Sequence, residues 1–308
     1  MTELSPTPLE LFQEQRGRLF GIAYRMLGTV TEAEEILQEA WLRWQGAARS
    51  EVYNPAAFLA KTVTNLCLTH LTTARARRET YVGEWLPEPV LTGAPLDDLG
   101  PLDLTEQRDS VSFALLLLLE RLTPAERAAY VLREAFAYSH REVADLIGTT
   151  EPNARQLHSR ARKRVVAGGR SRRVDPGEWR RLVERFVAAA RSGDIDGLAG
   201  LLAEDVVSRA DGGGKVNAAR NAVEGRERVA RYLIGVLRRF GAGVVPHFGE
   251  ANGEPALVAV DADGVRAVCF FRFEEDRLAG LDLVMNPDKL AFSEDQLSRI
   301  GGLSGLGW

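Results

Sequence analysis

The spacing of apolar residues changes along this chain, and the change limits what the chain can fold into. Over residues 9–79 and 105–167, apolar side chains recur at the period of an amphipathic helix. Between residues 206 and 285, short runs alternate apolar and polar side chains, as strands with one buried face do. The sequence therefore predicts helical domains followed by a domain with a sheet, and 308 residues are enough for two or three such units.

Two segments of different composition separate these zones. Residues 81–104 are rich in Pro, Gly and Asp, and residues 168–173 are rich in Gly and Arg. We expect a multidomain protein with two all-α domains and an α+β domain, in which two helical stretches precede a curved antiparallel sheet. The expected boundaries are 1–80 and 105–170 for the helical domains, 81–104 for a linker, 175–292 for the α+β domain and 293–308 for a tail.

Composition argues against several classes of protein. No apolar run reaches the roughly 18 residues that cross a membrane, so we expect no membrane contact. Cys67 and Cys269 lie far apart and form no CxxC pair, which argues against a disulfide framework or a structural metal site. Free cysteines suit a reducing compartment, so we expect a cytoplasmic protein, and the sequence indicates no cofactor.

A strongly basic stretch lies within a chain whose net charge is −4. Residues 151–173 hold eight basic residues and one acidic residue, a local charge that attracts phosphates. Ser139 and Glu142 predict a capping box for a short helix that ends at Gly148, and a longer helix is expected from residue 151 to about residue 166. This pattern predicts a helix-turn-helix.

The second helix of that motif has two different faces. Ala154, Leu157, Ala161 and Val165 share one face and are expected to pack inward. The opposite face offers side chains that can bond base edges or phosphates. They are Arg155, Gln156, Ser159, Arg160 and Lys163. The alternative is a solvated basic helix in an ordinary bundle.

The first helical zone contains a candidate partner-binding helix at residues 32–45. Thr31 with Glu34 predicts a capping box at its start, as Thr123 with Glu126 does for a later helix. The face opposite its apolar stripe carries Glu35, Gln38, Glu39 and Leu42. An exposed Leu among acidic residues can anchor a protein partner, although a single exposed Leu is also ordinary.

A third candidate surface lies on the helix expected at residues 55–78. It carries Lys61, Asn65, Arg75 and Arg77. These residues either face DNA or, at the end of the helix, complement the helix dipole. The local sequence leaves both interpretations open.

Several motifs, in the right order, resemble those of bacterial sigma factors of the extracytoplasmic-function type. The segment GTVTEAEEILQEAWLRW, from Gly28 to Trp44, resembles the core of sigma region 2. LTPAER at residues 122–127 and SRAR at residues 159–162 resemble region 4. Three further motifs resemble those of the subgroup with a C-terminal SnoaL-like domain: WLPEP at 85–89, DGGGK at 211–215 and NPDKL at 286–290.

The resemblance implies partners and residue roles. In this family the acidic helix of region 2 binds core RNA polymerase, which implies contacts by Glu35, Gln38, Glu39 and Leu42. Lys61, Asn65, Arg75 and Arg77 are then implied to read the −10 element of promoter DNA, and the basic face of the second helix-turn-helix helix the −35 element. The resemblance also implies that the SnoaL-like domain, an α+β cone, contacts the sigma domains and controls them. The implied regulatory residues are Trp85, Leu86, Pro87, Asp211, Lys215, Asn286, Pro287, Asp288, Lys289 and Leu290.

A SnoaL-like enzyme with a DNA-binding appendage is the main alternative. Folds of this kind include cyclases and isomerases that use a pocket carboxylate, and a fold does not fix its function. Asp282, within an apolar strand, and Asp211 are the candidate carboxylates. We expect no catalysis, and a ligand-sensing pocket in the same domain is a further alternative.

Overall fold

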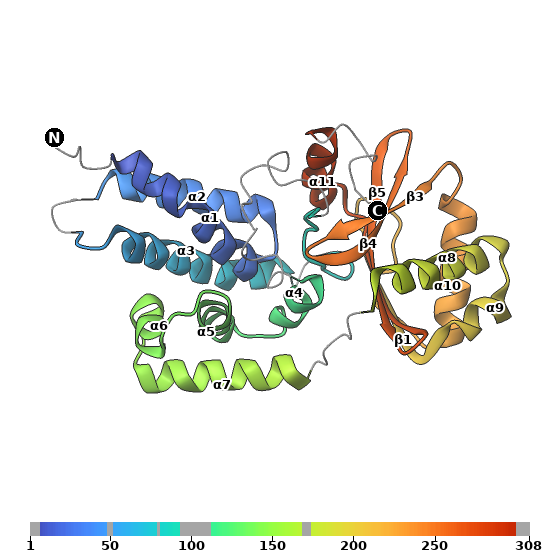
Figure 1. The fold of residues 1–308 in the computed structure, drawn as a ribbon, viewed down its shortest axis with the longest axis horizontal. Coiled ribbons are helices and arrows are strands. Elements are labelled where there is room, and N and C mark those ends of the chain that lie inside the picture. Colours follow the sequence, from blue (N-terminus) through green and yellow to red (C-terminus); the bar gives the residue numbers. More distant parts are fainter. Residues whose placement is uncertain (1–6, 48–51, 79–80, 93–111, 168–173, 300–308) are drawn as a thin grey trace. The chain divides into compact units, whose positions relative to one another are not determined.

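The structure, a computed structural model, describes residues 7–47, 52–78, 81–92, 112–167 and 174–299 (Figure 1). The chain forms two compact units. The first contains helices α1–α3 and α5–α7, and the second contains residues 81–92, a sheet and helices α8–α11. None of the helices in the described ranges is long and apolar enough to cross a membrane.

Helices α1 (Pro8–Leu27), α2 (Val30–Gln45) and α3 (Pro55–Arg78) pack together in the first unit. Their shared core includes the fully buried side chains of Phe20 and Trp44. The apolar stripes expected from the sequence thus face one another, as amphipathic helices require.

The turn between α1 and α2 is shorter than the sequence suggests. Gly28 ends α1 in the left-handed region at φ 79°, and Thr29 caps α2. The Thr29 hydroxyl accepts a hydrogen bond from the Glu32 backbone N–H at 3.3 Å. The predicted cap, Thr31 with Glu34, is therefore wrong by two residues, because the glycine turns the chain sharply enough for α2 to begin earlier.

Four helices follow in the next part of the chain: α4 (Phe113–Leu119), α5 (Pro124–Glu134), α6 (His140–Ile147) and α7 (Glu151–Ala167). Both capping boxes predicted here are confirmed, at Thr123 before α5 and at Ser139 before α6. Gly148 ends α6 at φ 68°, and α7 begins three residues later. Helices α6 and α7 therefore form the predicted helix-turn-helix.

Helix α5 also packs against α1 within the first unit. The buried Arg127 donates to the carbonyl oxygen of Met26, near the end of α1, at 2.8 Å. The same guanidinium pairs with Glu120 at 2.6 Å. The guanidinium of Arg25 lies 5.1 Å from the ring centroid of Phe136. Arg25 of α1 and Arg127 of α5 thus join the helices α1–α3 to the helices α5–α7.

The second unit contains a six-stranded mixed sheet in the order β2-β1-β6-β5-β4-β3. Strands β1 and β6 run parallel, and the other neighbouring pairs run antiparallel. The prediction of a wholly antiparallel sheet is therefore wrong for one pair. The strands are β1 (Leu202–Asp211), β2 (Val223–Glu224), β3 (Val245–Ala251), β4 (Glu254–Asp261), β5 (Gly264–Glu274) and β6 (Arg277–Val284).

Different helices cover the two faces of this sheet (Figure 1). Helices α8 (Pro176–Ser192), α9 (Ile195–Gly200) and α10 (Arg226–Phe240) share an apolar core with one face. Helix α11 (Pro287–Arg299) lies on the other side. It continues past the expected domain boundary at residue 292, because Ser293, Gln296 and Leu297 are buried on it.

Candidate functional site

The exposed face of α2 carries the residues predicted to bind polymerase. Glu35, Gln38, Glu39 and Leu42 are all exposed, and 65% of the Leu42 surface is accessible. Ala33, Ile36, Leu37, Ala40 and Trp44 are buried on the opposite side. Because the buried stripe holds the helix in place, the acidic face and its single Leu are presented to solvent.

Helix α3 presents the first two of its predicted DNA-binding residues. Lys61 and Asn65 are one turn apart and exposed. Arg75 and Arg77 lie near the end of the helix, where their side chains fall outside the described residues. The structure thus brings two of the four residues onto one exposed helix face.

Helix α7 presents the predicted recognition face. Arg155, Gln156, Ser159, Arg160 and Lys163 are all exposed. Ala154, Leu157 and Ala161 are buried on the other side, as predicted, and Val165 is half-buried. A helix held in this way can offer its polar side chains to a groove of DNA.

Arg160, one of these predicted residues, has a buried partner inside its own domain. Arg160 Nε lies 3.1 Å from the buried carboxylate of Glu126, and Arg164 pairs with the same carboxylate. Burial opposes ionisation of Glu126, but hydrogen bonds from Thr123 and the two arginines outweigh it and hold its pKa below the usual value. Arg160 therefore helps to orient α7 on α5.

Residues 81–92, expected to be part of a linker, fold onto the C-terminal domain; we call them the strap. Every residue from Leu86 to Thr92 is buried. Leu91 forms an antiparallel bridge with Ala251 at the end of β3. The Asn252 backbone N–H donates to the carbonyl oxygen of Val90 at 2.8 Å. The strap therefore extends the pairing of an edge strand.

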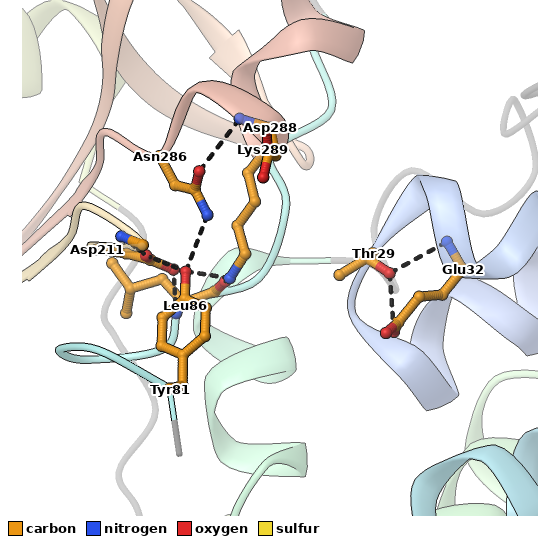
Figure 2. Close-up of polar contacts among 9 residues, drawn as sticks. Thr29, Glu32, Tyr81, Leu86, Asp211, Asn286, Asp288 and Lys289 are labelled. Atoms are coloured by element: carbon orange, nitrogen blue, oxygen red, sulfur yellow. Dashed lines mark hydrogen bonds and ion pairs between the residues drawn. The ribbon is translucent and has the colours of Figure 1, made fainter. Parts of the chain in front are cut away.

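A buried ion pair lies at the centre of the strap's contacts (Figure 2). Lys289 Nζ lies 2.7 Å from Asp211 Oδ2, with side-chain exposures of 8% and 0%. The same ammonium donates to the carbonyl oxygen of Leu86, and the Leu86 backbone N–H donates to Asp211 Oδ2 at 2.9 Å. It also lies 4.0 Å from the ring centroid of Trp85. Both charges therefore bond the strap as well as each other.

A second set of bonds extends this network. The Tyr81 hydroxyl donates to Asp211 Oδ1 at 2.6 Å and accepts from Asn286 Nδ2 at 2.9 Å. Burial and the hydrogen bond to Asp211 raise the Tyr81 pKa, so the phenol stays protonated as a donor. Asn286 also accepts from the Asp288 backbone N–H, which fixes the start of α11.

Helix α11 binds the second half of the strap through two buried polar side chains. Gln296 accepts from the Leu91 backbone N–H at 2.9 Å and donates to the Leu91 carbonyl oxygen at 3.1 Å. Ser293 donates to the carbonyl oxygen of Pro89 at 3.0 Å. Each bond satisfies a strap backbone group that burial removes from water.

The structure brings together the three motifs that the sequence separates by up to about 200 residues. Of the ten predicted regulatory residues, Leu86, Asp211, Asn286 and Lys289 bond one another or a common partner, and Trp85 stacks on the ammonium. Lys215 and Asp288 form a separate, exposed pair at 2.6 Å. Pro87 and Leu290 are buried, and Pro287 is exposed at the start of α11.

Sequence reasoning did not single out several strap partners. They are Asn252, Ser293 and Gln296. A signal existed for α11, since Lys289, Ser293 and Gln296 repeat at the helical period among apolar residues. That spacing predicts polar groups on a buried helix face.

The Asp282 side chain does not lie on the face of the sheet that α8, α9 and α10 cover. Leu281 and Leu283 belong to the core beneath α8 and α10, so the side chain between them points to the opposite face. There Asp282 pairs with Arg209 at 2.9 Å. Burial raises the pKa of Asp282, while Arg209 favours its charged form. Asp211 lies on the same face and is held by the strap.

Family models match three parts of the chain. Residues 11–77 match the family described as Sigma-70 region 2, residues 112–165 match Sigma-70, region 4, and residues 183–281 match the SnoaL-like domain.

Relatives of known sequence or structure match most of the chain. The chain is 39% identical over 292 residues to the ECF RNA polymerase sigma factor SigJ of Mycobacterium tuberculosis, covering 92% of this chain and 93% of the relative. It is 28% identical over 284 residues to the probable ECF sigma factor SigI of the same species, covering 91% and 93%. The crystal structure of M. tuberculosis SigJ aligns with a TM-score of 0.70 at 37% identity, covering 91% of this chain and 97% of that one. The chain therefore belongs to the extracytoplasmic-function family of RNA polymerase sigma factors and carries a SnoaL-like domain after its two sigma regions.

Proposed function

We propose that this sigma factor binds core RNA polymerase through the exposed face of α2. Leu42 supports the assignment, because 65% of its surface is exposed and a partner that covers it removes this apolar surface from water. Glu35, Gln38 and Glu39 surround it and supply a polar rim.

Promoter reading is assigned to α3 and α7. Lys61, Asn65, Arg75 and Arg77 read the −10 element, where separated strands offer bases to a protein surface. Arg155, Gln156, Ser159, Arg160 and Lys163 read the −35 element from the major groove. The exposed polar face of α7, seated on buried Ala154 and Leu157, supports this assignment.

Reading both elements requires the first unit to open. The −10 and −35 elements lie about 25 base pairs apart, or about 85 Å of duplex at 3.4 Å per base pair. Helices α1 and α5 instead pack together through Arg127 and the Met26 carbonyl. This contact has to break when both elements are bound, so the packed unit is a resting form.

The C-terminal domain controls that opening by holding the strap. The observation that carries this proposal is the buried Asp211–Lys289 pair, which bonds both backbone groups of Leu86. The strap connects the end of α3 with the helices of region 4. Its release frees 12 residues, which span up to about 40 Å when extended. A held strap therefore shortens the tether between the two DNA-reading regions.

Transcription in vitro with core polymerase tests this function. Lys289→Met removes the charge that holds the strap and keeps a chain of similar length, and Lys215→Met removes the exposed pair with Asp288 as a matched control. We expect promoter-specific transcripts from the unaltered protein, more from Lys289→Met, and no change with Lys215→Met.

Two outcomes would count against the proposal. Absence of specific transcripts from the full chain, from Lys289→Met and from a chain ending at residue 167, with suitable promoters tested, would sink the sigma function. Equal output from the two lysine variants would leave the sigma function and remove control by the strap.

A further inference from the structure

Helices α8 and α10 carry a concentration of positive charge that the sigma function does not explain. Helix α8 holds four arginines and two glutamates, and α10 holds five arginines and one glutamate. The two helices therefore have a net charge of +6 in a chain whose net charge is −4.

The arginines lie on the outer side of the helical layer. Trp179, Val183 and Phe186 of α8 are buried against the sheet, as are Val229 and Leu233 of α10. Projected at 100° per residue, the exposed arginines fall on the opposite side of each helix. We call these residues the arginine surface: Arg181 and Arg185 of α8 with Arg228, Arg231, Arg238 and Arg239 of α10.

Much of this charge is not neutralised within the domain. Arg231 pairs with Glu227 at 2.6 Å. Within the described residues, no ion pair involves Arg181, Arg185 or Arg228. An arginine is charged at any physiological pH, and its planar fork of donors matches the geometry of a phosphate.

A polyanion fits this surface better than the acidic helix of the same chain does. The carboxylates of α2 are largely engaged, since Glu32 accepts a hydrogen bond from Thr29, Glu34 pairs with Arg16 and Glu39 with Arg43. Glu35 alone offers little charge to complement six arginines. Duplex DNA carries about one charge per 1.7 Å of its axis, and this protein's family already works on duplex DNA.

We propose that the arginine surface binds the backbone of promoter DNA beside the site that α7 reads. The inference rests on the proposed reading of DNA by α7. Helix α7 ends at Ala167 and α8 begins at Pro176, and the sequence between them contains Arg170, Arg172 and Arg173. This short tether gives the C-terminal domain a high effective concentration at DNA that α7 has bound. The contact is to phosphates, so it adds affinity without adding sequence preference.

Fluorescence anisotropy with a labelled 40-base-pair duplex and the full chain tests the proposal. The surface variant combines Arg181→Gln, Arg185→Gln and Arg228→Gln. The matched control combines Arg220→Gln, Arg277→Gln and Arg299→Gln, three exposed arginines elsewhere in the domain. Both variants lose the same charge, so a general electrostatic effect would change them equally.

We expect the surface variant to bind about tenfold more weakly at low salt, and the control to stay within about twofold of the unaltered protein. The slope of log affinity against log salt concentration should become shallower by about 2 to 3 in the surface variant, because each lost phosphate contact removes about 0.9.

Equal affinities of the surface variant and the control would overturn the proposal. Weaker binding to core polymerase with unchanged DNA binding would also overturn it, because the partner would then be a protein. A further variant on α7, Gln156→Ala with Lys163→Ala, separates the two hypotheses. If only the α7 variant binds DNA more weakly, the proposal for the arginine surface is wrong and the reading of DNA by α7 stands. If the α7 variant binds DNA as the unaltered protein does, the proposed reading of DNA by α7 is wrong.

Discussion

The charged side chains of α7 and those that hold the strap both form close ion pairs, but the former are exposed to solvent and the latter are buried. The Arg155 side chain on α7 is 63% exposed, whereas Lys289 and Asp211 are 8% and 0% exposed. An exposed ion pair contributes about 0.2–1 kcal/mol, while breaking one side of a buried pair costs about 3–5 kcal/mol. A surface for a partner that comes and goes keeps its charges hydrated. The strap is bound by a partner in the same chain, so the charges that hold it, Asp211 of β1 and Lys289 of α11, can be buried.

The largest expected effect tests whether burial makes this difference. Lys289→Met should lower the free energy of unfolding of the C-terminal domain by about 3–5 kcal/mol, because Asp211 is left buried without its cation. Hydrogen exchange at the Leu86 amide, which donates to Asp211, should be faster in this variant than in the unaltered protein. Urea denaturation and exchange measurements check both.

Lys215→Met provides the matched exposed case, with an N···O distance of 2.6 Å to Asp288 in the unaltered protein. It should lower the same free energy by less than about 1 kcal/mol. Similar losses from the two lysine variants would show that burial does not distinguish the two pairs.

A smaller effect is expected where the strap is held by neutral groups. Gln296→Leu keeps the apolar volume but leaves the N–H and carbonyl of Leu91 buried without the partners they now have. We expect a loss of about 2–4 kcal/mol in domain stability, at about 1–2 kcal/mol for each of the two neutral groups. Ser298→Ala is a control on the same helix, since its hydroxyl is exposed. Equal stability of the two variants would contradict the role of Gln296.

On α7 the expected effect moves from stability to binding. Gln156→Ala should weaken promoter binding by about 1–3 kcal/mol, as the loss of one specific base contact does, and leave the melting temperature unchanged because the side chain is exposed. Anisotropy with promoter and scrambled duplexes checks the specificity. A drop in thermal stability as large as that expected for Lys289→Met would show that Gln156 stabilises the fold, as the residues that hold the strap do.

The smallest effect concerns Glu126, which is buried but pairs with exposed arginines. Burial opposes its ionisation, yet bonds from Thr123 and the arginines keep its pKa low. Because the pKa of Glu126 is lower in the folded state than in the unfolded state, its carboxylate stabilises the fold at pH values above the unfolded pKa of about 4.3. This stabilisation is lost as the pH falls through the folded pKa. Glu126→Gln should therefore be less stable than the unaltered protein at pH 7, and the difference should shrink below about pH 4. Urea unfolding at several pH values measures it, and a pH-independent difference would contradict the assignment.

Local signals in the sequence predicted much of the first unit. The capping boxes at Thr123 and Ser139 and the buried face of α7 depend on residues within a few positions of one another. The Thr29 cap was missed because two threonines compete within three positions, and only the turn at Gly28 decides between them. The bond from Arg160 to Glu126 spans 34 residues, so no local pattern indicates it.

The second unit was harder to predict because its bonds join distant segments. Motifs marked Trp85, Asp211 and Lys289 as important but did not show that they meet. In strand β3 the alternation is a weak signal, because Pro246 and Gly249 interrupt it. For Asp282, alternation predicts a face opposite to Leu281, but only the packed helices show which face is which.

The bridge between Leu91 and Ala251 has a consequence for the lifetime of the active protein. While the strap is bound, it covers the end of β3, an edge strand. Once it leaves, that edge is uncovered together with the apolar side chains of Leu86 and Leu91, which are now at most 1% exposed. Uncovered edges and apolar strands pair with other chains. If the strap is released as we propose, self-association competes with binding to polymerase, and the concentration of the protein then limits how long an unbound copy with a free strap persists.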